Sequence, residues 1–387
     1  MIDPARLRAS YASFLTPATG EPRRLLLTGH SHQAWPDVAR EGLLEAFTLA
    51  AAHVDDKWSA VFDAQAELAA HITARIGGRA DEIAFAPNTH ELVVRFLSAL
   101  PLTTRPHIVT TGGEFHSAFR QLRRLAEEGI EVTFVPVAPT HTLAERLAGA
   151  VTDRTSAVIA STVLFETSTI VHGLEAVLEA AERVGAHVLL DAYHAFDIVP
   201  FRVPERAFLV GGGYKYAQWG EGVCFLRVPA GCTLRPVFTG WFAGYAELAN
   251  RRTEGPVGYA DDGATRFAGS TFDPASTLRA RAVARFFEGQ GMTVEALRAT
   301  SLAQTGRLLA AVADLPRLTV ATPTADADRG GFVSLRTSDA TALSKALRED
   351  GVFTDARGDM LRLGPAPYLL DAELDDAVAL LRARLRA

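Results

Sequence analysis

A single lysine lies in a glycine- and aromatic-rich connection between two apolar runs. Lys215 has Tyr214 and Tyr216 as its neighbours, and no other charged residue occurs between Gly211 and Gly220. A lysine removed from water has a lowered pKa, and its neutral amine can form a Schiff base. This chemistry anchors pyridoxal 5′-phosphate (PLP). The alternative is an ordinary loop lysine whose amine reaches solvent.

A carboxylate and a histidine follow another apolar run, at Asp191 and His194. A buried carboxylate is costly unless it is paired, and a PLP pyridine nitrogen offers such a partner. An aspartate at that nitrogen keeps it protonated, so that the ring can accept electrons. His194 could support Asp191 or contact the ring hydroxyl. The alternative is an Asp191 that caps the next segment and a His194 with ordinary hydrogen-bond partners.

Three further turns carry groups that a phosphate or a ring could use. Residues 88–91 (NTHE) stand between a strand and a helix, where backbone N–H groups and the Thr89 hydroxyl can bind phosphate. The same residues also fit a helix start of the capping-box type. Phe115 could stack on a cofactor ring or pack in the core. Residues 269–271 (GST) could donate to a phosphate or end a turn.

An arginine occurs inside an apolar strand near the end of the chain. Arg362 lies in the run 360–364 (MLRLG). A buried arginine needs an anionic partner, and a substrate carboxylate held by two hydrogen bonds would provide one. The alternative is an edge-strand arginine that faces solvent.

Short apolar runs alternate with amphipathic helices around these residues. Strands are expected at 83–86, 107–111, 132–137, 157–161, 187–191, 207–211 and 223–228. This alternation predicts an α/β fold with a mainly parallel sheet, helices on both faces and ligands at the carboxyl ends of the strands. A strand at 25–28 and helices at 37–53 and 58–76 precede the alternation. Asp37 is expected to cap the first of these helices.

The C-terminal part has a different rhythm. Strands are expected at 318–322, 332–337 and 360–364, and helices at 341–349 and 371–385, which is an α+β pattern. Residues 229–275 are irregular and rich in Gly, Pro and aromatic residues. We therefore expect a large domain at 51–275 and a small C-terminal domain at 276–387, with residues 1–50 packing on the small one.

Composition narrows the class of protein. The 387 residues are 48% hydrophobic and 22% charged, which is typical of a globular chain with two lobes. A net charge of −6 without a basic run makes nucleic acid or an anionic membrane an unexpected partner. The start lacks an apolar signal-type core, so a cytoplasmic protein is expected. Neither Cys-x-x-Cys nor His-Glu-x-x-His occurs, so no metal site is expected.

Taken in this order, the motifs resemble those of the fold-type I PLP enzymes of the class V aminotransferase superfamily, and most of all kynureninase. The resemblance rests on YKYAQWGEG at 214–222, DAYH at 191–194, GWF at 240–242, FAGST at 267–271 and LRLGPAPY at 361–368. It implies a large domain with a seven-stranded, mainly parallel sheet and a smaller α+β C-terminal domain. It also implies hydrolytic cleavage of the Cβ–Cγ bond of a kynurenine-type amino acid, release of alanine and a place in tryptophan catabolism.

The resemblance implies a role for each matching residue. Lys215 would carry the cofactor, Asp191 would pair with the pyridine nitrogen with His194 beside it, and Phe115 would stack on the ring. Lys215, Asp191, His194 and Tyr214 would form the catalytic group.

The phosphate would be held by Thr89, His90, Tyr214 and Trp241. Arg362 would bind the substrate α-carboxylate. Ser270 or Thr271 would reach the phosphate of the neighbouring subunit, which implies a homodimer with shared active sites.

Five positions depart from the family pattern, and His90 is one of them. His30, His32 and Gln33 stand where Asn, an apolar residue and Gly are expected. All three are candidate substrate residues, and His30 and His32 are candidates for recognising or polarising the aryl ketone. Leu164 ends the run TVL where the family places HVN. The alternatives are therefore an aminotransferase or lyase acting on another amino acid, or a PLP-fold binding protein without catalysis. Cysteine desulfuration is disfavoured, because residues 233–387 contain no cysteine to act as the nucleophile.

Overall fold

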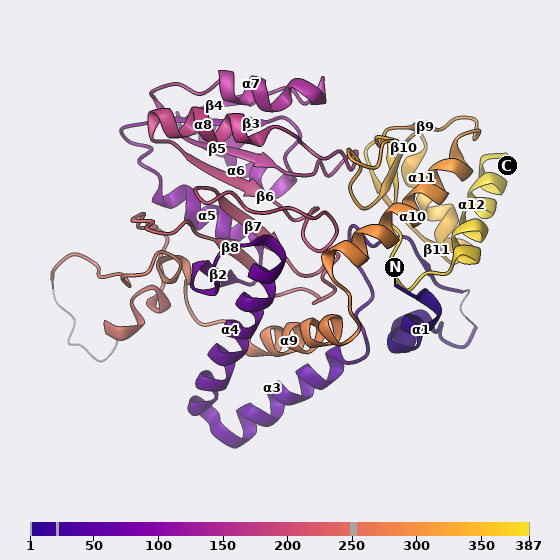
Figure 1. Ribbon diagram of the computed structural model, residues 1–387, viewed down its shortest axis with the longest axis horizontal. Coiled ribbons are helices and arrows are strands. Elements are labelled where there is room, and N and C mark those ends of the chain that lie inside the picture. Colours follow the sequence, from indigo (N-terminus) through magenta and orange to yellow (C-terminus); the bar gives the residue numbers. More distant parts are fainter. Residues whose placement is uncertain (1, 21–22, 248–253, 387) are drawn as a thin grey trace.

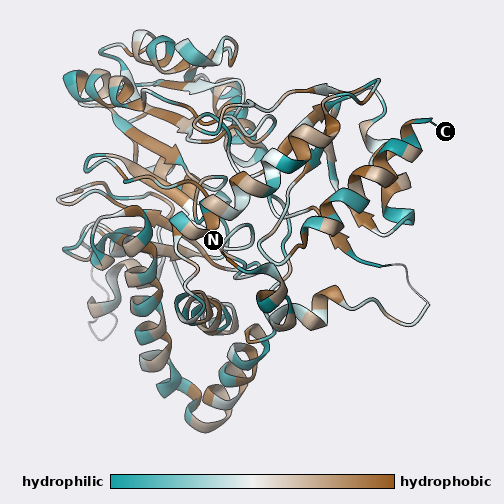
Figure 2. Ribbon diagram, turned by 45° about the vertical axis from the view of Figure 1, so that its right-hand side comes forward, coloured by the Kyte–Doolittle hydropathy of each residue, from teal (hydrophilic) through white to brown (hydrophobic). Residues whose placement is uncertain are grey.

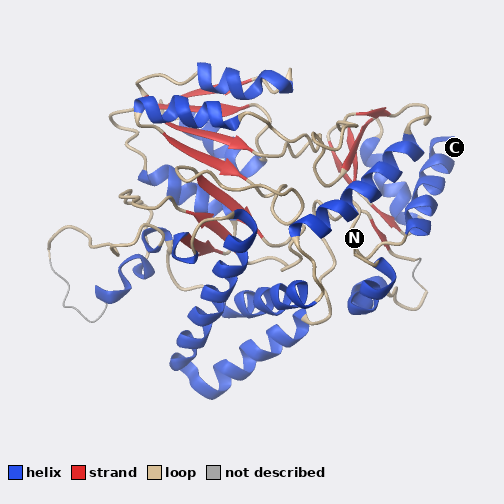
Figure 3. Ribbon diagram, viewed as in Figure 1, coloured by secondary structure: helices blue, strands red, loops and turns tan. Residues whose placement is uncertain are grey.

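The chain folds into two lobes, each with its own sheet (Figure 1). The computed structural model describes residues 2–20, 23–247 and 254–386. A seven-stranded sheet with helices on both sides forms the large lobe, and a four-stranded sheet with helices forms the small lobe (Figure 3). Within these residues, no helix combines the length and apolar composition that a bilayer span requires.

The large sheet is mainly parallel, as predicted. Its strand order is β2-β8-β7-β6-β5-β3-β4, and only β8 runs antiparallel to its neighbours. The strands are β2 (Ile83–Ala86), β3 (His107–Thr111), β4 (Glu131–Val135), β5 (Thr155–Ser161), β6 (His187–Asp191), β7 (Phe208–Gly212) and β8 (Cys224–Arg227).

Both faces of this sheet are buried, which explains why its strands are continuous apolar runs. Along β5, Val158 packs into the same core as α4 (Lys57–Ile76), α7 (Leu143–Gly149) and α8 (Leu174–Val184). The next residue, Ile159, packs into the core of α5 (Thr89–Ala99) and α6 (His116–Glu127) on the other face. Successive side chains of a strand point to opposite faces, so the two helical layers are filled by alternate residues. Figure 2 shows hydrophobic colouring along strands of the large sheet.

The small lobe contains an antiparallel sheet in the order β12-β13-β10-β9. These strands are β9 (Thr319–Val320), β10 (Val333–Arg336), β12 (Asp355–Arg357) and β13 (Met360–Leu363). Three helices belong to this part of the chain: α10 (Val294–Val312), α11 (Ala340–Glu349) and α12 (Asp371–Arg386). The sequence analysis did not predict β12 or the two-residue β11 (Val352–Phe353).

The N-terminal segment contacts the small lobe. It begins with α1 (Pro4–Arg8), η1 (Ala9–Tyr11) and α2 (Ala12–Leu15), followed by β1 (Leu25–Leu26), which pairs in parallel with β11. The Tyr11 ring lies 4.6 Å from that of Tyr368. The domain limits at 51–275 and 276–387 stay a prediction. Helix α9 (Pro274–Gly289) crosses the predicted limit, and it packs on both α4 and α3 (Ala39–His53).

The expected cap of the third helix is wrong. Helix α3 starts at Ala39 behind Val38, and no side chain caps it. The Asp37 carboxylate instead accepts a hydrogen bond of 3.1 Å from the backbone N–H of Ser13. The carboxylate therefore joins the N-terminal segment to this turn.

Candidate active site

Lys215 lies on the turn that follows β7 at the carboxyl edge of the large sheet. Its side chain is 5% exposed, so it is not a loop lysine that reaches solvent. The turn can pass here only because glycines precede it. A Cβ on Gly212 would lie 2.4 Å from Cys224 Sγ, and one on Gly213 would lie 2.4 Å from the Trp219 ring. Close packing under β7 therefore fixes the place of the lysine.

The amine of Lys215 is enclosed by aromatic rings and one imidazole. Its Nζ lies 2.6 Å from His194 Nε2, and 4.8 Å and 5.4 Å from the ring centroids of Tyr193 and Phe115. The pKa of Lys215 is lowered to about 7. Burial is the main cause, the Asp191 charge opposes it by raising the pKa, and the Arg362 charge lowers the pKa. A neutral amine is thus available near neutral pH.

His194 is buried beside this amine and is neutral. Burial lowers its pKa well below the usual value, and the neighbouring Lys215 charge adds to the effect. Its Nδ1 has no hydrogen-bond partner among the described residues. The Nε2–Nζ contact can therefore hold a proton between the two side chains.

A small cavity adjoins the amine. Its walls come from the carboxyl ends of β2, β5, β6 and β7 and from the start of α6, as expected for a parallel sheet. The lining residues are Thr89, Phe115, Ser161, Val163, Phe165, Asp191, Tyr193, His194, Tyr214 and Lys215. The structure thus brings together most of the groups predicted for the cofactor.

Asp191 ends β6 and faces this cavity. Its Oδ1 accepts a hydrogen bond of 2.8 Å from the backbone N–H of Tyr193, so the predicted capping alternative is present as well. Burial raises the pKa of Asp191, and the Lys215 charge opposes the rise. A carboxylate in this position gains from a cationic partner.

Thr89 and Tyr214 both line this cavity. The capping alternative for residues 88–91 is correct, because Asn88 Oδ1 accepts a 2.9 Å hydrogen bond from the Glu91 N–H. Thr89, the first residue of α5, nevertheless lines the cavity, whereas the His90 side chain is exposed. Burial raises the pKa of Tyr214 to about 12, so its phenol keeps its proton.

Arg362 is buried in β13, between β12 and β10, so the solvent-facing alternative is wrong. Its Nη1 donates to the Phe165 carbonyl at 2.6 Å, and Nη2 donates to the Asp355 carboxylate. Phe165 lines the cavity, so the guanidinium lies directly behind its wall. Nε of Arg362 has no partner in the described part of the chain.

Two of the three predicted substrate residues of the first turn lie near this region. His30 is fully buried, its ring stacks on Phe332 at 4.4 Å, and its Nε2 lies 3.7 Å from Asp355. Burial lowers the pKa of His30 well below its usual value, and the Arg362 charge reinforces the shift. His32 is exposed, and its ring stacks on Tyr214 at 5.2 Å.

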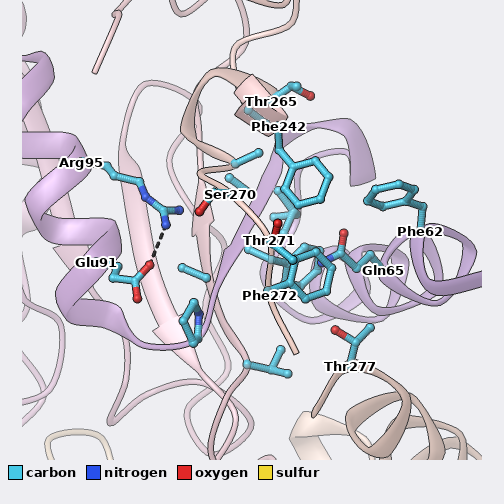
Figure 4. Close-up of a pocket in the computed structure, with 18 of the residues that line it drawn as sticks. Phe62, Gln65, Glu91, Arg95, Phe242, Thr265, Ser270, Thr271, Phe272 and Thr277 are labelled. Carbon is cyan, nitrogen blue, oxygen red and sulfur yellow. Dashed lines mark hydrogen bonds and ion pairs between the residues drawn. The ribbon is translucent and has the colours of Figure 1, made fainter. Parts of the chain in front are cut away.

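Other predicted site residues lie apart from Lys215 within one chain. The Gln33 amide donates to the Gly29 carbonyl at 3.1 Å and accepts from Gln218 at 2.9 Å. Trp241 donates to Thr271 at 3.1 Å. Figure 4 shows Ser270 and Thr271 in a second pocket, of about 350 Å³, with Phe62, Phe242 and Phe272. None of these residues lines the cavity at Lys215.

The sequence analysis missed several residues that the structure places at the site. Ser161, Val163, Phe165 and Tyr193 line the cavity. Ser161 and Tyr193 could have been identified, since each lies at the end of a predicted strand. Asp355, which pairs with Arg362, lies on a strand too short to predict.

The residues at this cavity fit PLP. A buried amine of lowered pKa, a carboxylate that needs a cation and an aromatic ring surround one space, with the start of helix α5 on its wall. No three metal-binding side chains cluster in residues 2–20, 23–247 and 254–386.

Comparisons with known sequences agree with this arrangement. The family model "Kynureninase C-terminal domain" matches residues 297–381. The chain is 28% identical to a kynureninase of Deinococcus radiodurans over 87% of its own length and 81% of the relative's. A Bacillus cereus kynureninase is 29% identical over 56% of the chain, and this match spans about half of that relative, 51%. A Rickettsia bellii cysteine desulfurase IscS is 26% identical over 44% of the chain and 43% of the relative.

Solved structures show the same fold. A variant of C-DES with glycine linked to its PLP cofactor superposes with a TM-score of 0.82 at 18% identity, over 97% of this chain and 98% of that one. The apo cysteine desulfurase of Thermococcus onnurineus gives 0.82 at 16% identity, over 100% and 99%. The predicted fold class, fold type I with a smaller C-terminal lobe, is confirmed.

Proposed function

We propose that this protein, a kynureninase-like chain of the class V aminotransferase superfamily, holds PLP on Lys215. We further propose that it hydrolyses the Cβ–Cγ bond of a kynurenine-type amino acid. The products are alanine and an aryl acid. The observation that supports the proposal most is the buried amine of Lys215, with a pKa of about 7, between His194 and the Phe115 ring. Such an amine can bind an aldehyde and accept a proton near neutral pH.

The residues around the cavity divide into those that hold the cofactor and those that hold the substrate. Asp191 would pair with the pyridine nitrogen and keep it protonated, Phe115 would stack on the ring, and Thr89, the His90 amide and Tyr214 would hold the phosphate. When bound, PLP supplies the electron sink for charge that develops at the substrate's α-carbon. The chain's own residues bind the substrate and move its α-proton in this proposal.

Lys215 and His194 move the α-proton in this proposal. The neutral Lys215 amine accepts it, and His194 Nε2, at 2.6 Å, shares the resulting charge. Arg362 holds the α-carboxylate through donors that Phe165 and Asp355 leave free. His30 and His32 remain proposed recognition residues for the aryl ketone. Gln33 remains a proposed substrate residue, although its amide oxygen accepts a hydrogen bond from Gln218.

A homodimer with shared active sites is part of the proposal. Several large apolar side chains of residues 237–245 are exposed, among them Phe238 at 64% and Tyr245 at 48%. The pocket in Figure 4 lies beside them and contains Ser270 and Thr271, which have no role in their own chain's cavity. We propose that a partner chain covers this region and that these two hydroxyls reach its phosphate. Light scattering that gives the mass of one chain would contradict the dimer.

The activity is tested with the purified protein after loading with PLP. A visible absorbance band that Lys215→Ala abolishes would establish the anchor. Incubation with kynurenine and with 3-hydroxykynurenine should then release alanine and the matching anthranilate, measured by mass spectrometry. A protein that binds PLP through Lys215 yet forms no alanine from either compound would exclude this hydrolysis.

A second candidate is an aminotransferase or a lyase that acts on a different amino acid. The observation in its favour is Leu164, which is buried, and whose side chain cannot form the hydrogen bonds of the expected Asn. A panel of amino donors with keto-acid acceptors separates the two candidates, because a transaminase yields a new amino acid without cleaving carbon–carbon bonds. A binding protein without catalysis is a third candidate, and the buried lysine at the cavity argues against it.

A further inference from the structure

A buried carboxylate that the proposed reaction does not use lies immediately before Phe115. Glu114 is 3% exposed and does not line the cavity. Its Oε1 accepts hydrogen bonds from Thr111 Oγ1 at 2.5 Å and from the Ser161 N–H at 3.1 Å. Its Oε2 accepts one from Ser161 Oγ at 2.6 Å. Both oxygens are thus satisfied by donors from two neighbouring strands.

These hydrogen bonds connect the two sides of the cavity. Ser161 lines the cavity at the end of β5 and pairs in register with Asp191 on β6. The next residue, Thr162, donates its N–H to the Asp191 carbonyl at 2.9 Å. Phe115, next to Glu114, lies across the cavity with its ring 5.4 Å from the Lys215 amine. Glu114 is therefore the link between the ring-bearing turn and the acid-bearing strand.

Burying a carboxylate in the core has a large free-energy cost unless its oxygens accept hydrogen bonds. The pKa of Glu114 is raised to about 7, because burial and, to a smaller extent, the Asp191 charge raise it by more than the Ser161 and Thr111 donors lower it. An apolar residue would cost nothing to bury but would leave three donors unpaired. At this position, therefore, the free energy gained from three satisfied donors outweighs the free-energy cost of burying the carboxylate.

We infer that Glu114 is a positioning residue of the cofactor site, which sets the spacing between Phe115, which would stack on the ring, and Asp191, which would pair with the ring nitrogen. This inference rests on the proposed PLP cofactor but not on the reaction that the cofactor serves. It assigns to Glu114 no contact with substrate or cofactor.

The test compares PLP binding in the wild type, Glu114→Ala and Glu114→Gln. Ligand-free protein is titrated with PLP, and the dissociation constant and the visible circular dichroism of the bound cofactor are measured. Glu114→Ala should bind PLP about tenfold more weakly, the scale of one lost set of buried hydrogen bonds, and should change the circular dichroism per bound cofactor. Glu114→Gln keeps an acceptor for the Thr111 hydroxyl and the Ser161 N–H and should stay within about threefold of wild type.

Glu82→Ala is the matched control. Glu82 is a buried carboxylate of the same lobe that accepts from Arg227 Nε at 2.9 Å, far from the cavity lining, and Arg227 keeps three carbonyl partners without it. This variant should lower the Tm and leave PLP affinity and circular dichroism unchanged. The inference is wrong if Glu114→Ala behaves in the same way.

Two milder variants keep the test decisive if Glu114→Ala does not fold. Ser161→Ala and Thr111→Val each remove one donor to Glu114 without leaving its carboxylate bare. Each should weaken PLP binding about two- to fivefold and alter the circular dichroism. Wild-type values in both would overturn the inference. A wild-type protein that does not bind PLP would instead contradict the proposed cofactor, which is a separate outcome.

Discussion

At the scale of single residues, the site depends on a lysine that its surroundings keep neutral. The Lys215 pKa of about 7 lies below the usual value because of burial. The charged amine is disfavoured in the folded state, so the neutral form prevails above about pH 7.

The first prediction follows from that sign. The rate at which ligand-free protein captures PLP should rise with pH and reach half of its maximum near pH 7. An exposed lysine would instead have its midpoint near pH 10. The chain has only two other lysines, Lys57 and Lys345. Stopped-flow absorbance measures the rate, a Lys57→Ala/Lys345→Ala variant should give the same profile, and a midpoint near pH 10 would contradict the prediction.

Asp355 carries the second prediction, because it holds the guanidinium of Arg362 from β12. Asp355→Asn removes the charge and loosens the guanidinium, so KM for the amino acid should rise about three- to tenfold with little change in kcat. Asp359→Asn, in the same hairpin and paired with exposed Arg336, is the control. Equal KM values in both variants would show that Asp355 does not position Arg362.

Residue types alone identified part of this site. Lys215 and Asp191 have unusual sequence neighbours, and both lie where a parallel sheet must gather its strand ends. Glu114 and Asp355 could not be assigned, because their partners Ser161 and Arg362 become visible only when strands are paired. Arg362 was recognised as needing an anion, but sequence could not supply Asp355 as that partner.

At the scale of elements, strand β7 and its glycines position the lysine. Gly212→Ala would put a methyl group 2.4 Å from Cys224 Sγ and 2.5 Å from the Tyr193 hydroxyl. The third prediction is a loss of about 1–3 kcal/mol in the free energy of unfolding, together with weaker PLP binding, because β7 must shift. Gly306→Ala in α10 has open space around its new Cβ and should stabilise by about 0.5–1 kcal/mol. Denaturant unfolding and PLP titration measure both effects, and a Gly212→Ala protein as stable as wild type would refute the constraint.

Elements with strong periodicity were predictable, and short ones were not. The limits of β2, β3 and β6 match the predicted runs, because buried strands between helices are bounded by polar turns. β11 and β12 contain two and three residues, too few for any period to be visible. The Asp37 cap failed because the Ser13 N–H, distant in sequence, competes for the carboxylate.

At the scale of the whole molecule, the residues of the second pocket are distinct from those around Lys215, and in the proposed dimer they would serve the active site of the partner chain. Ser270 and Thr271 lie in that pocket, not at Lys215 (Figure 4). If active sites are shared, a Ser270→Ala/Thr271→Val variant should bind PLP weakly although its own Lys215 cavity is intact. Lys215→Ala should lack the lysine-linked absorbance band altogether.

The fourth prediction is that these two defective variants complement each other. In a mixed dimer, the Ser270→Ala/Thr271→Val chain supplies Lys215, and the Lys215→Ala chain supplies both hydroxyls to that same site. Random pairing gives about half mixed dimers with one intact site each, so the absorbance band should return to about a quarter of the wild-type value at a PLP concentration that fills intact sites but not defective ones. Co-expression with two different tags allows the mixed dimers to be isolated. If they bind no more PLP than the double-hydroxyl variant alone, each site is built from a single chain, because only a shared site can be repaired by exchanging partners.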